Sequence, residues 1–338
     1  MPDQKKDKKQ STKASLAEVA KLAGVSPITV SRALSNPDVV REKTRIKVQK
    51  AIDKTGYVPN PFARNLRSSA SSFLAVFVDN IQNNQFMNAV KGCTDALAEQ
   101  NLRLLLSETG YSESSELEAI ENVLPFQPAA MVFVGVVRSP IARNRLKGLD
   151  IPIVEMWDFT PDPLDILVGF SNTEGGRVMG RHFCEKDYTS IAYVGRTDGR
   201  EGLRLTGFKE ELLRGGRDVE FLLPFTETDE IKYGKTALEN LLEEFPDCKA
   251  AFFATDMLAI GAIFECRRRG ISIPDDLAIA GFGDINIAGL LSSPLTTVHV
   301  PDYKMGVRSG ESVKARLNGN LSQNSVLFDL PLLVRATS

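Results

Sequence analysis

The strongest constraint on the fold of this chain is a repeated pattern, in which short apolar runs alternate with amphipathic stretches from residue 73 to residue 282. Such runs are typical of strands buried on both faces of a parallel sheet, and the stretches between them are typical of helices. Because more than 200 residues exceed one ordinary open sheet, we expect two similar subdomains. The runs are Phe73–Val78, Leu102–Leu106, Met131–Val137, Ile151–Met156, Ile166–Phe170, Ile191–Val194, Ala251–Ala254 and Leu277–Phe282.

The first part of the chain differs from the rest in charge. Residues 1–70 contain 15 Lys and Arg against 6 Asp and Glu, whereas the remainder contains 26 against 37. A basic segment on an acidic body favours a polyanionic partner for that segment alone, because phosphates would repel the body. A solvated basic tail is the alternative that charge by itself leaves open.

Several classes of protein are disfavoured by what the sequence contains. The N-terminus is polar and Lys-rich, and no run of eighteen apolar residues occurs, so we expect a cytoplasmic protein with no membrane segment. The 4 cysteines form no C-x-x-C pair and only 2 histidines are present, which disfavours disulfide scaffolds and zinc fingers. We therefore expect neither a metal nor a cofactor.

Residues 15–60 have the pattern of three short helices. The apolar residues of Leu16–Ala23 follow the spacing of one helix face, and Gly24 is a typical left-handed helix end. Ser26 and Pro27 are typical of a second helix start, because the hydroxyl caps free amides and proline is tolerated in the first turn. A third amphipathic helix ends at Gly56. This pattern predicts an all-α helix-turn-helix, whose second helix can enter the major groove of DNA.

The early part of that second helix supplies the expected contacts to DNA. Short hydroxyl side chains suit phosphates and base edges, and an arginine can bond two acceptors of guanine at once. For any single position, a solvated surface residue is the alternative. The residues expected to face DNA are Ser26, Pro27, Ile28, Thr29, Ser31 and Arg32.

Three segments make this region similar to the DNA-binding head and hinge of the lactose-repressor/galactose-repressor family. They are E-V-A-K-L-A-G-V-S at residues 18–26, T-V-S-R at 29–32 and G-Y-V-P-N at 56–60. The resemblance implies that Pro27, Ile28 and Arg32 read bases, and that a hinge over residues 59–67 becomes helical when two hinges meet on an operator. In the hinge it implies DNA contacts by Asn60, Arg64 and Leu66, with the leucine wedged into the minor groove.

The same resemblance implies the organisation of the whole chain. We expect a basic disordered tail over residues 1–14, the helix-turn-helix over 15–60, a hinge over 61–71 and an effector-binding and dimerisation domain over 72–338. That domain should be an α/β fold like the periplasmic sugar-binding proteins, with two parallel-sheet subdomains and three crossovers between them. The N-subdomain would comprise about 72–170 and 302–330, and the C-subdomain about 171–300 and 331–338.

Polar residues gather where the predicted strands end. In open α/β sheets, ligands bind beyond the carboxyl ends of the strands, so these residues should line a cleft for a small hydroxylated or charged metabolite. Solvent-facing strand ends are the alternative for each residue alone. The strand-end residues are Asp79, Asn80, Ser107, Glu108, Arg138, Glu155, Asp158, Ser171, Asn172, Arg196, Thr255, Asp256 and Asp284.

The segment G-R-T-D-G-R-E-G-L-R-L-T-G-F at residues 195–208 carries the sharper signal. Arg204 matches the arginine with which the family clamps a carboxylate or sugar hydroxyls, and Arg200 lies one helical turn earlier on the same face. By the same matching, Phe86 touches the effector and Phe170 stacks on it, with plain core as the alternative for both. The full set expected to bind the effector is Gln85, Phe86, Glu155, Asp158, Phe170, Asn172, Arg200, Arg204, Thr255, Asp256 and Asp284.

One departure from the family narrows the ligand. The family often carries an acid that binds sugar hydroxyls where this chain has Gly283, which disfavours a simple neutral sugar. Segments such as residues 151–172 and 255–284 resemble the gluconate-utilisation repressors, which implies a sugar acid such as gluconate. Related acids such as 2-ketogluconate, a neutral sugar and a nucleobase remain alternatives.

We expect a homodimeric repressor that releases or binds double-stranded operator DNA in response to this effector, and not an enzyme. No Walker loop, G-x-S-x-G elbow, H-E-x-x-H or G-x-G-x-x-G motif occurs in the sequence. A sugar-binding protein without DNA-binding activity is the second alternative, which the helix-turn-helix and the missing signal peptide disfavour.

Overall fold

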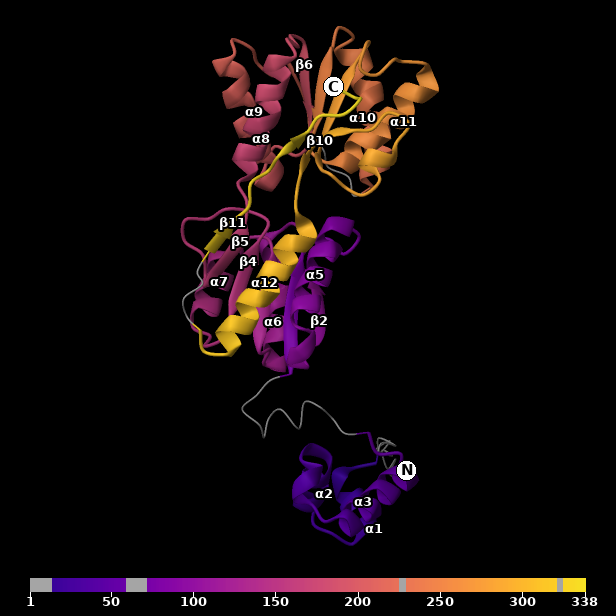
Figure 1. Ribbon diagram of the computed structural model, residues 1–338, viewed down its shortest axis with the longest axis vertical. Coiled ribbons are helices and arrows are strands. Elements are labelled where there is room, and N and C mark those ends of the chain that lie inside the picture. The colour runs from indigo at the N-terminus through magenta and orange to yellow at the C-terminus, as the bar shows by residue number, and fades with distance from the viewer. Residues whose placement is uncertain (1–13, 59–71, 225–228, 321–324) are drawn as a thin grey trace, which may run out of the picture. The chain divides into compact units, whose positions relative to one another are not determined.

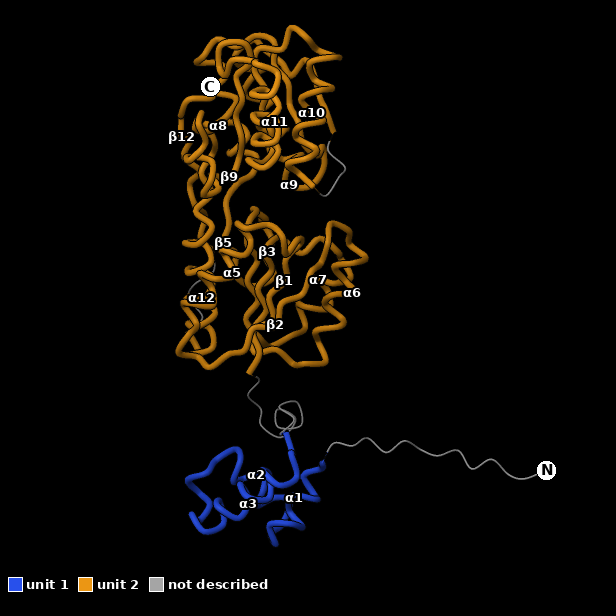
Figure 2. Tube along the Cα trace, turned by 90° about the vertical axis from the view of Figure 1, so that its right-hand side faces the viewer, with its two compact units in different colours: residues 1–70 blue, residues 71–338 orange. Residues whose placement is uncertain are grey.

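The computed structural model describes residues 14–58, 72–224, 229–320 and 325–338. It contains two compact units, residues 1–70 and residues 71–338 (Figure 2). The predicted tail up to residue 13 and the predicted hinge, with Asn60, Arg64 and Leu66, lie outside the described residues.

The first unit is a three-helix head. Its helices are α1 (Leu16–Ala23), α2 (Pro27–Ser35) and α3 (Glu42–Thr55), with a 3₁₀ turn at Pro37–Val39. One apolar residue from α2, Val30, is fully buried among residues of α1 and α3. The helix-turn-helix that the sequence predicts is therefore present.

Local capping residues set the ends of these helices. The Ser26 hydroxyl accepts a hydrogen bond from the Thr29 amide at 3.2 Å, with Pro27 in the first turn of α2. Gly24 and Gly56 end α1 and α3 with φ of +66° and +63°, a region that glycine enters without a steric penalty.

The second unit begins with a six-stranded sheet in the order β11-β5-β4-β3-β1-β2, in which every pairing is parallel. Helices α5 and α12 pack together on one side of the sheet, with α6 and α7 on the other (Figure 1). We call these elements the N-lobe. They are β1 (Phe73–Val78), α5 (Asn84–Ala96), β2 (Arg103–Glu108), α6 (Glu113–Val123), β3 (Ala130–Val134), α7 (Pro140–Lys147), β4 (Ile153–Met156), β5 (Ile166–Gly169), α12 (Asp302–Leu317) and β11 (Ser325–Leu327).

The other elements form the C-lobe around a sheet in the order β12-β10-β9-β8-β6-β7. Helix α8 packs against α9, and α10 packs against α11 (Figure 1). They are α8 (Asn172–Glu185), β6 (Ile191–Val194), α9 (Gly199–Arg214), β7 (Phe221–Leu223), α10 (Glu230–Glu244), β8 (Ala250–Phe253), α11 (Asp256–Arg269), β9 (Ala278–Gly283), β10 (Thr296–His299) and β12 (Leu332–Leu333). Short 3₁₀ turns lie at Ala98–Gln100, Leu124–Phe126 and Ala288–Leu290.

The chain passes between the lobes three times, from β5 to α8, from β10 to α12 and from β11 to β12. This confirms the predicted fold class of a helical head followed by two parallel-sheet subdomains.

Alternate residues of β1 face different helix layers, since Val76 packs with α5 whereas Phe77 packs with α6 and α7. Burial on both faces explains why β1 appears in the sequence as a continuous apolar run.

Two expectations about the strands were wrong. Strand β2 lies at the edge of its sheet, and Leu104 and Leu106 on it are 44% and 39% exposed, so this run is not buried on both faces. Strands β7, β10, β11 and β12 were not predicted, and β12 pairs antiparallel with β10. Strands β7, β11 and β12 have only two or three residues each, too short for a periodic pattern to mark them. Strand β10 has four residues, but two threonines and a histidine among them keep it from appearing as an apolar run.

Candidate functional site

A cavity of about 730 Å³ lies between the N-lobe and the C-lobe. The loops that follow β1 to β4 line it from one side, and those that follow β6 and β8 line it from the other. Of the polar strand-end residues, Asp79, Arg138, Asp158, Arg196 and Thr255 line this space, whereas Asn80, Ser107, Glu108, Glu155, Ser171, Asn172, Asp256 and Asp284 do not. This volume is within the usual range for a small-molecule site.

Six of the eleven residues predicted to bind an effector line this cavity, and five do not. The lining residues are Gln85, Phe86, Asp158, Arg200, Arg204 and Thr255. The other five are bonded or packed within the protein and do not line the cavity: Glu155, Phe170, Asn172, Asp256 and Asp284.

Glu155 and Asp284 hold loops and strands together. The fully buried Glu155 carboxylate accepts from the Val137 amide at 2.9 Å and from Arg143 at 3.0 Å. Asp284 accepts from Arg335 at 2.6 Å and lies 2.8 Å from the His299 ring, next to the crossover segments. Both carboxylates are already paired with protein groups.

Asp256 is fully enclosed at the start of α11. Its carboxylate accepts from the Thr297 hydroxyl at 2.6 Å and from the Ile285 amide at 2.9 Å. Burial raises the pKa of Asp256 to about 6, because a low-dielectric environment disfavours the charged form. Its neighbour Thr255 lines the cavity instead.

Arg204 is the most unusual cation of the cavity. It is only 5% exposed, and its guanidinium lies 3.8 Å from the centre of the Phe282 ring. Its Nε donates to Asn172 at 2.9 Å and its Nη1 to the Ala254 carbonyl at 2.6 Å. Among the described residues, no carboxylate forms an ion pair with Arg204. Burial lowers the pKa of Arg204, because its charge is removed from water.

Arg200, one turn earlier on α9, is placed quite differently. Its Nη2 donates to the Asp79 carboxylate at 2.6 Å and its Nη1 to the Val134 carbonyl at 3.2 Å. Its guanidinium also lies 5.1 Å from the centre of the Phe86 ring. All three partners belong to the N-lobe, so this side chain of the C-lobe crosses the cavity.

A row of aromatic rings forms the floor beneath these arginines. Phe86 meets Trp157 edge-on with centroids 5.0 Å apart, and Phe170 lies 6.1 Å from Trp157 and 6.2 Å from Phe282. Phe170 therefore supports the floor from behind. Trp157 lines the cavity, and its backbone has a left-handed φ of +67°. This backbone geometry is strained for a bulky residue, and such strain is common at ligand sites.

Sequence reasoning did not assign Trp157 or Glu230 to the site. The signal for Trp157 was available, because it is the single tryptophan of the chain and directly follows a predicted strand. Glu230 bonds the Thr255 hydroxyl at 2.5 Å, and burial raises the pKa of Glu230. Its position at the start of α10 carries no such signal, because the preceding strand was not recognised.

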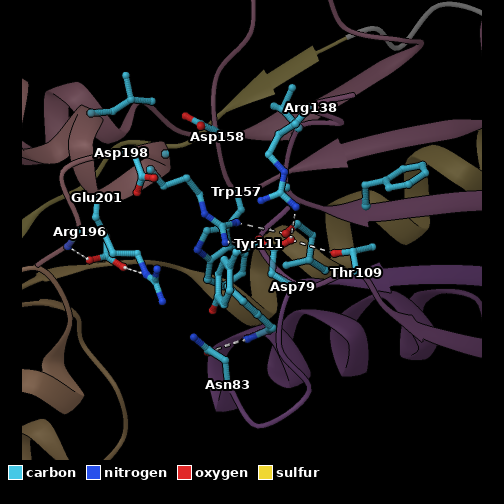
Figure 3. A pocket seen from close by; sticks show the side chains of 18 of the residues that line it. Asp79, Asn83, Thr109, Tyr111, Arg138, Trp157, Asp158, Arg196, Asp198 and Glu201 are labelled. Atoms are coloured by element: carbon cyan, nitrogen blue, oxygen red, sulfur yellow. Dashed lines mark hydrogen bonds and ion pairs between the residues drawn. The ribbon is translucent and has the colours of Figure 1, made fainter. Parts of the chain in front are cut away.

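Asp79 and Arg138 were expected only as members of a polar edge. In the structure, Asp79 accepts from Thr109 at 2.9 Å and from Arg138 at 3.2 Å (Figure 3). Burial raises the pKa of Asp158, which accepts a hydrogen bond from Asn172 at 3.1 Å. The cavity thus offers both guanidinium donors and carboxyl groups to a ligand.

The described residues contain no cluster of three or more His, Cys, Asp or Glu arranged to hold a metal ion. Within the same part of the chain, no helix combines the length and the apolar composition that crossing a membrane requires.

The head presents the predicted DNA-facing residues on the first turns of α2. Pro27, Ile28 and Arg32 are exposed, with Ile28 at 62%, whereas Thr29 and Ser31 are half-buried. An isoleucine so exposed on a small head suits an apolar contact with a partner surface. Ser26 is exposed but also caps α2, so its hydroxyl has a structural use as well.

Known proteins share both parts of the chain. Residues 15–60 match the family model of bacterial regulatory proteins of the lacI family, and residues 181–338 match a periplasmic binding protein-like domain. The HTH-type transcriptional regulator GntR of Pseudomonas aeruginosa is 33% identical, with 96% of this chain and 95% of that protein covered. GntR of Escherichia coli K12 is 30% identical, with 90% and 92% covered. A LacI-family regulator structure from Silicibacter pomeroyi has a TM-score of 0.87 at 27% identity, covering 96% of this chain and 99% of that one.

The chain has a helix-turn-helix head and a two-lobed binding domain, and the relatives that match it over nearly their whole length are transcriptional regulators. These features define a DNA-binding transcriptional regulator and not an enzyme. The chain belongs to the LacI family of bacterial regulatory proteins.

Proposed function

We propose that the cavity binds a small sugar acid such as gluconate, and that this effector controls the binding of a homodimer to operator DNA. The buried charge of Arg204 carries the proposal. A buried guanidinium without a carboxylate partner is costly, and an anionic ligand would offset that cost. The bonds to Asn172 and Ala254 use Nε and Nη1, and among the described residues nothing bonds to Nη2.

The rest of the cavity fits a polyol chain. Asp158, Glu230 and Thr255 are hydrogen-bonding groups on its wall, and Trp157 and Phe86 provide apolar surface for carbon atoms. The two relatives named GntR support the gluconate branch of the family. A neutral sugar or a nucleobase could form hydrogen bonds with these wall residues but would bring no negative charge to Arg204.

In the dimer, two heads would bind the operator, each through the exposed surface of its helix α2. In this proposal the contacts are made by Ser26, Pro27, Ile28, Thr29, Ser31 and Arg32, with Asn60, Arg64 and Leu66 of the hinge. The effector acts by preferring one relative orientation of the lobes, and such couplings are typically about 1–3 kcal/mol.

Titration calorimetry of the full-length protein tests the ligand class. Gluconate and glucitol are a matched pair, because they share the polyol chain and differ in the carboxylate. We expect gluconate to bind at least about tenfold more tightly, which corresponds to about 1.4 kcal/mol. Equal binding of the two compounds, or tighter binding of a purine, would contradict the proposal.

Two variants test whether the carboxylate of gluconate binds to Arg204. Arg204→Lys keeps the charge but loses the planar pair of donors, so it should weaken gluconate binding far more than glucitol binding. Arg196→Lys is the matched control within the cavity, because Glu201 already pairs with Arg196. Operator binding with and without gluconate, followed by fluorescence anisotropy on wild type, then checks that the ligand is an effector.

A further inference from the structure

The ion pair between Asp79 and Arg200 joins the two lobes across the cavity. Asp79 follows β1 of the N-lobe, Arg200 lies on α9 of the C-lobe, and their charged atoms are 2.6 Å apart. The two side chains are only 11% and 16% exposed. Ion pairs shielded from water in this way are weakened less by salt than surface pairs are.

The charges around Asp79 show which partner depends on it. Arg138 contacts both Asp79 at 3.2 Å and Glu116 at 3.4 Å, so it keeps a carboxylate if Asp79 is neutralised. Asp79 is the only carboxylate paired with Arg200 among the described residues. Thr109 and Arg138 both donate to the other oxygen of Asp79, which fixes the carboxylate for Arg200.

Arg200 and Arg204 share helix α9 but differ in what neutralises them. Arg200 forms an ion pair with a protein carboxylate, whereas Arg204 forms none within the described part of the chain. A ligand anion is therefore expected at Arg204, while Arg200 stays paired with Asp79. The Arg200–Asp79 pair draws α9 toward the N-lobe. A ligand anion on Arg204 that also contacts the N-lobe wall of the cavity would favour the same relative orientation of the lobes.

We infer that Asp79 is a positioning residue that holds the lobes together through Arg200 and so sets the affinity of the cleft for its effector. This inference rests on the proposed function, because it assigns a regulatory role within the same cleft. By linkage, a contact that favours the ligand-binding orientation raises ligand affinity without touching the ligand.

Trp157 provides a readout of the lobes that needs no ligand. It is the single tryptophan of the chain and is 3% exposed. Its ring meets Phe86 of the N-lobe, and its carbonyl accepts a hydrogen bond from Asn172 of the C-lobe. Because Trp157 lines the cavity between the lobes, separation of the lobes should expose this ring, and quenching of its fluorescence by acrylamide measures the opening.

The test uses Asp79→Asn in the full-length protein. Without ligand, we expect stronger acrylamide quenching of Trp157 than in wild type, and with gluconate, binding weaker by roughly fivefold or more. Asp198→Asn is the matched control, because Asp198 lines the same cavity but forms no ion pair within the described ranges. It should leave the quenching unchanged.

Arg200→Gln removes the same ion pair from the other lobe and keeps the test valid if Asp79→Asn fails to fold. The double variant should be quenched no more than either single variant, because both remove one interaction. Unchanged quenching in both folded single variants would overturn the inference, as would weaker gluconate binding with unchanged quenching. If gluconate fails to bind wild type, only the proposed ligand is contradicted, since the quenching still tests the ion pair.

Discussion

The Gln85 side chain of the N-lobe occupies the space that a side chain on Gly283 of the C-lobe would need. The Gln85 amide donates to the Gly283 carbonyl at 2.8 Å, and a Cβ added to Gly283 would lie 2.6 Å from the Gln85 Oε1. The glycine also has a φ of +136°. The family often carries an acid at the position of Gly283. In this chain the Gln85 side chain, which reaches across from the other lobe, fills the space where that acid's side chain would begin.

This relationship predicts that Gly283→Ala destabilises the chain. The strained φ alone should cost about 1–3 kcal/mol, and the collision with Gln85 should add to it. Urea unfolding of the full chain measures the loss, and Gln85→Ala in the same background should recover the part due to the collision. Gly270→Ala is the control, because Gly270 has a φ of +72° and open space around it. An equal loss at both glycines would mean that Gln85 does not matter.

The buried carboxyl of Asp256 predicts a pH dependence of stability. Its folded pKa of about 6 lies above the unfolded value of about 3.9, so between these values the folded chain holds a proton that the unfolded chain releases. This group therefore lowers the free energy of unfolding as the pH rises through that window, and its effect levels off above it. Other acids titrate in the same range, so a variant is needed to isolate it.

Asp256→Asn removes the titration and loses one acceptor at every pH. The stability advantage of wild type over this variant should be larger at about pH 4.5 than at about pH 7.5. Urea unfolding of both proteins over this range measures the difference. A difference that stays constant with pH would show that the carboxyl keeps an ordinary pKa.

The exposed Arg32 on α2 predicts a loss of sequence preference. Arg32→Ala should weaken binding to the preferred operator by about 1–3 kcal/mol and should relax the preference at one base pair. Lys50→Ala on α3 removes the same charge from an exposed position outside α2. Fluorescence anisotropy against a panel of operator variants separates the two, and uniform weakening by Arg32→Ala would argue against base reading.

Ser26 combines two uses that substitutions can separate. Ser26→Ala removes the cap of α2 and should cost about 1 kcal/mol of local stability. Ser26→Asp keeps a capping oxygen but adds a negative charge, so it should preserve α2 while weakening operator binding. Hydrogen exchange of the α2 amides in the full chain reports local stability. Unchanged operator affinity in Ser26→Asp would remove Ser26 from the interface.

Local features of the sequence were enough for the head and for strands β1 and β6. The ends of α1, α2 and α3 depend on Ser26, Gly24 and Gly56, whose effects reach only a few residues along the chain. Strands β1 and β6 have the bounds of their apolar runs. The family resemblance supplied the number of crossovers and the position of Arg204, which periodicity alone does not provide.

The assignment of the polar strand ends needed the tertiary structure. Sequence reasoning treated Glu155, Asp256 and Asp284 as ligand groups, but each is bonded by donors from other elements. Whether a strand-end carboxylate faces a cavity or a neighbouring loop depends on how those loops fold over it. The residues next to the carboxylate in the sequence do not determine which of the two it faces.

The sequence by itself therefore determined the class of this protein, the helical head and the edge of the sheets where polar groups collect. The tertiary structure decided which charges are neutralised. Arg200 pairs with Asp79, 121 residues away, whereas Arg204 on the same helix forms no ion pair with any carboxylate among the described residues. Caps and strand periods are set over a few residues, but an ion pair forms only where folding brings distant segments within a few ångströms.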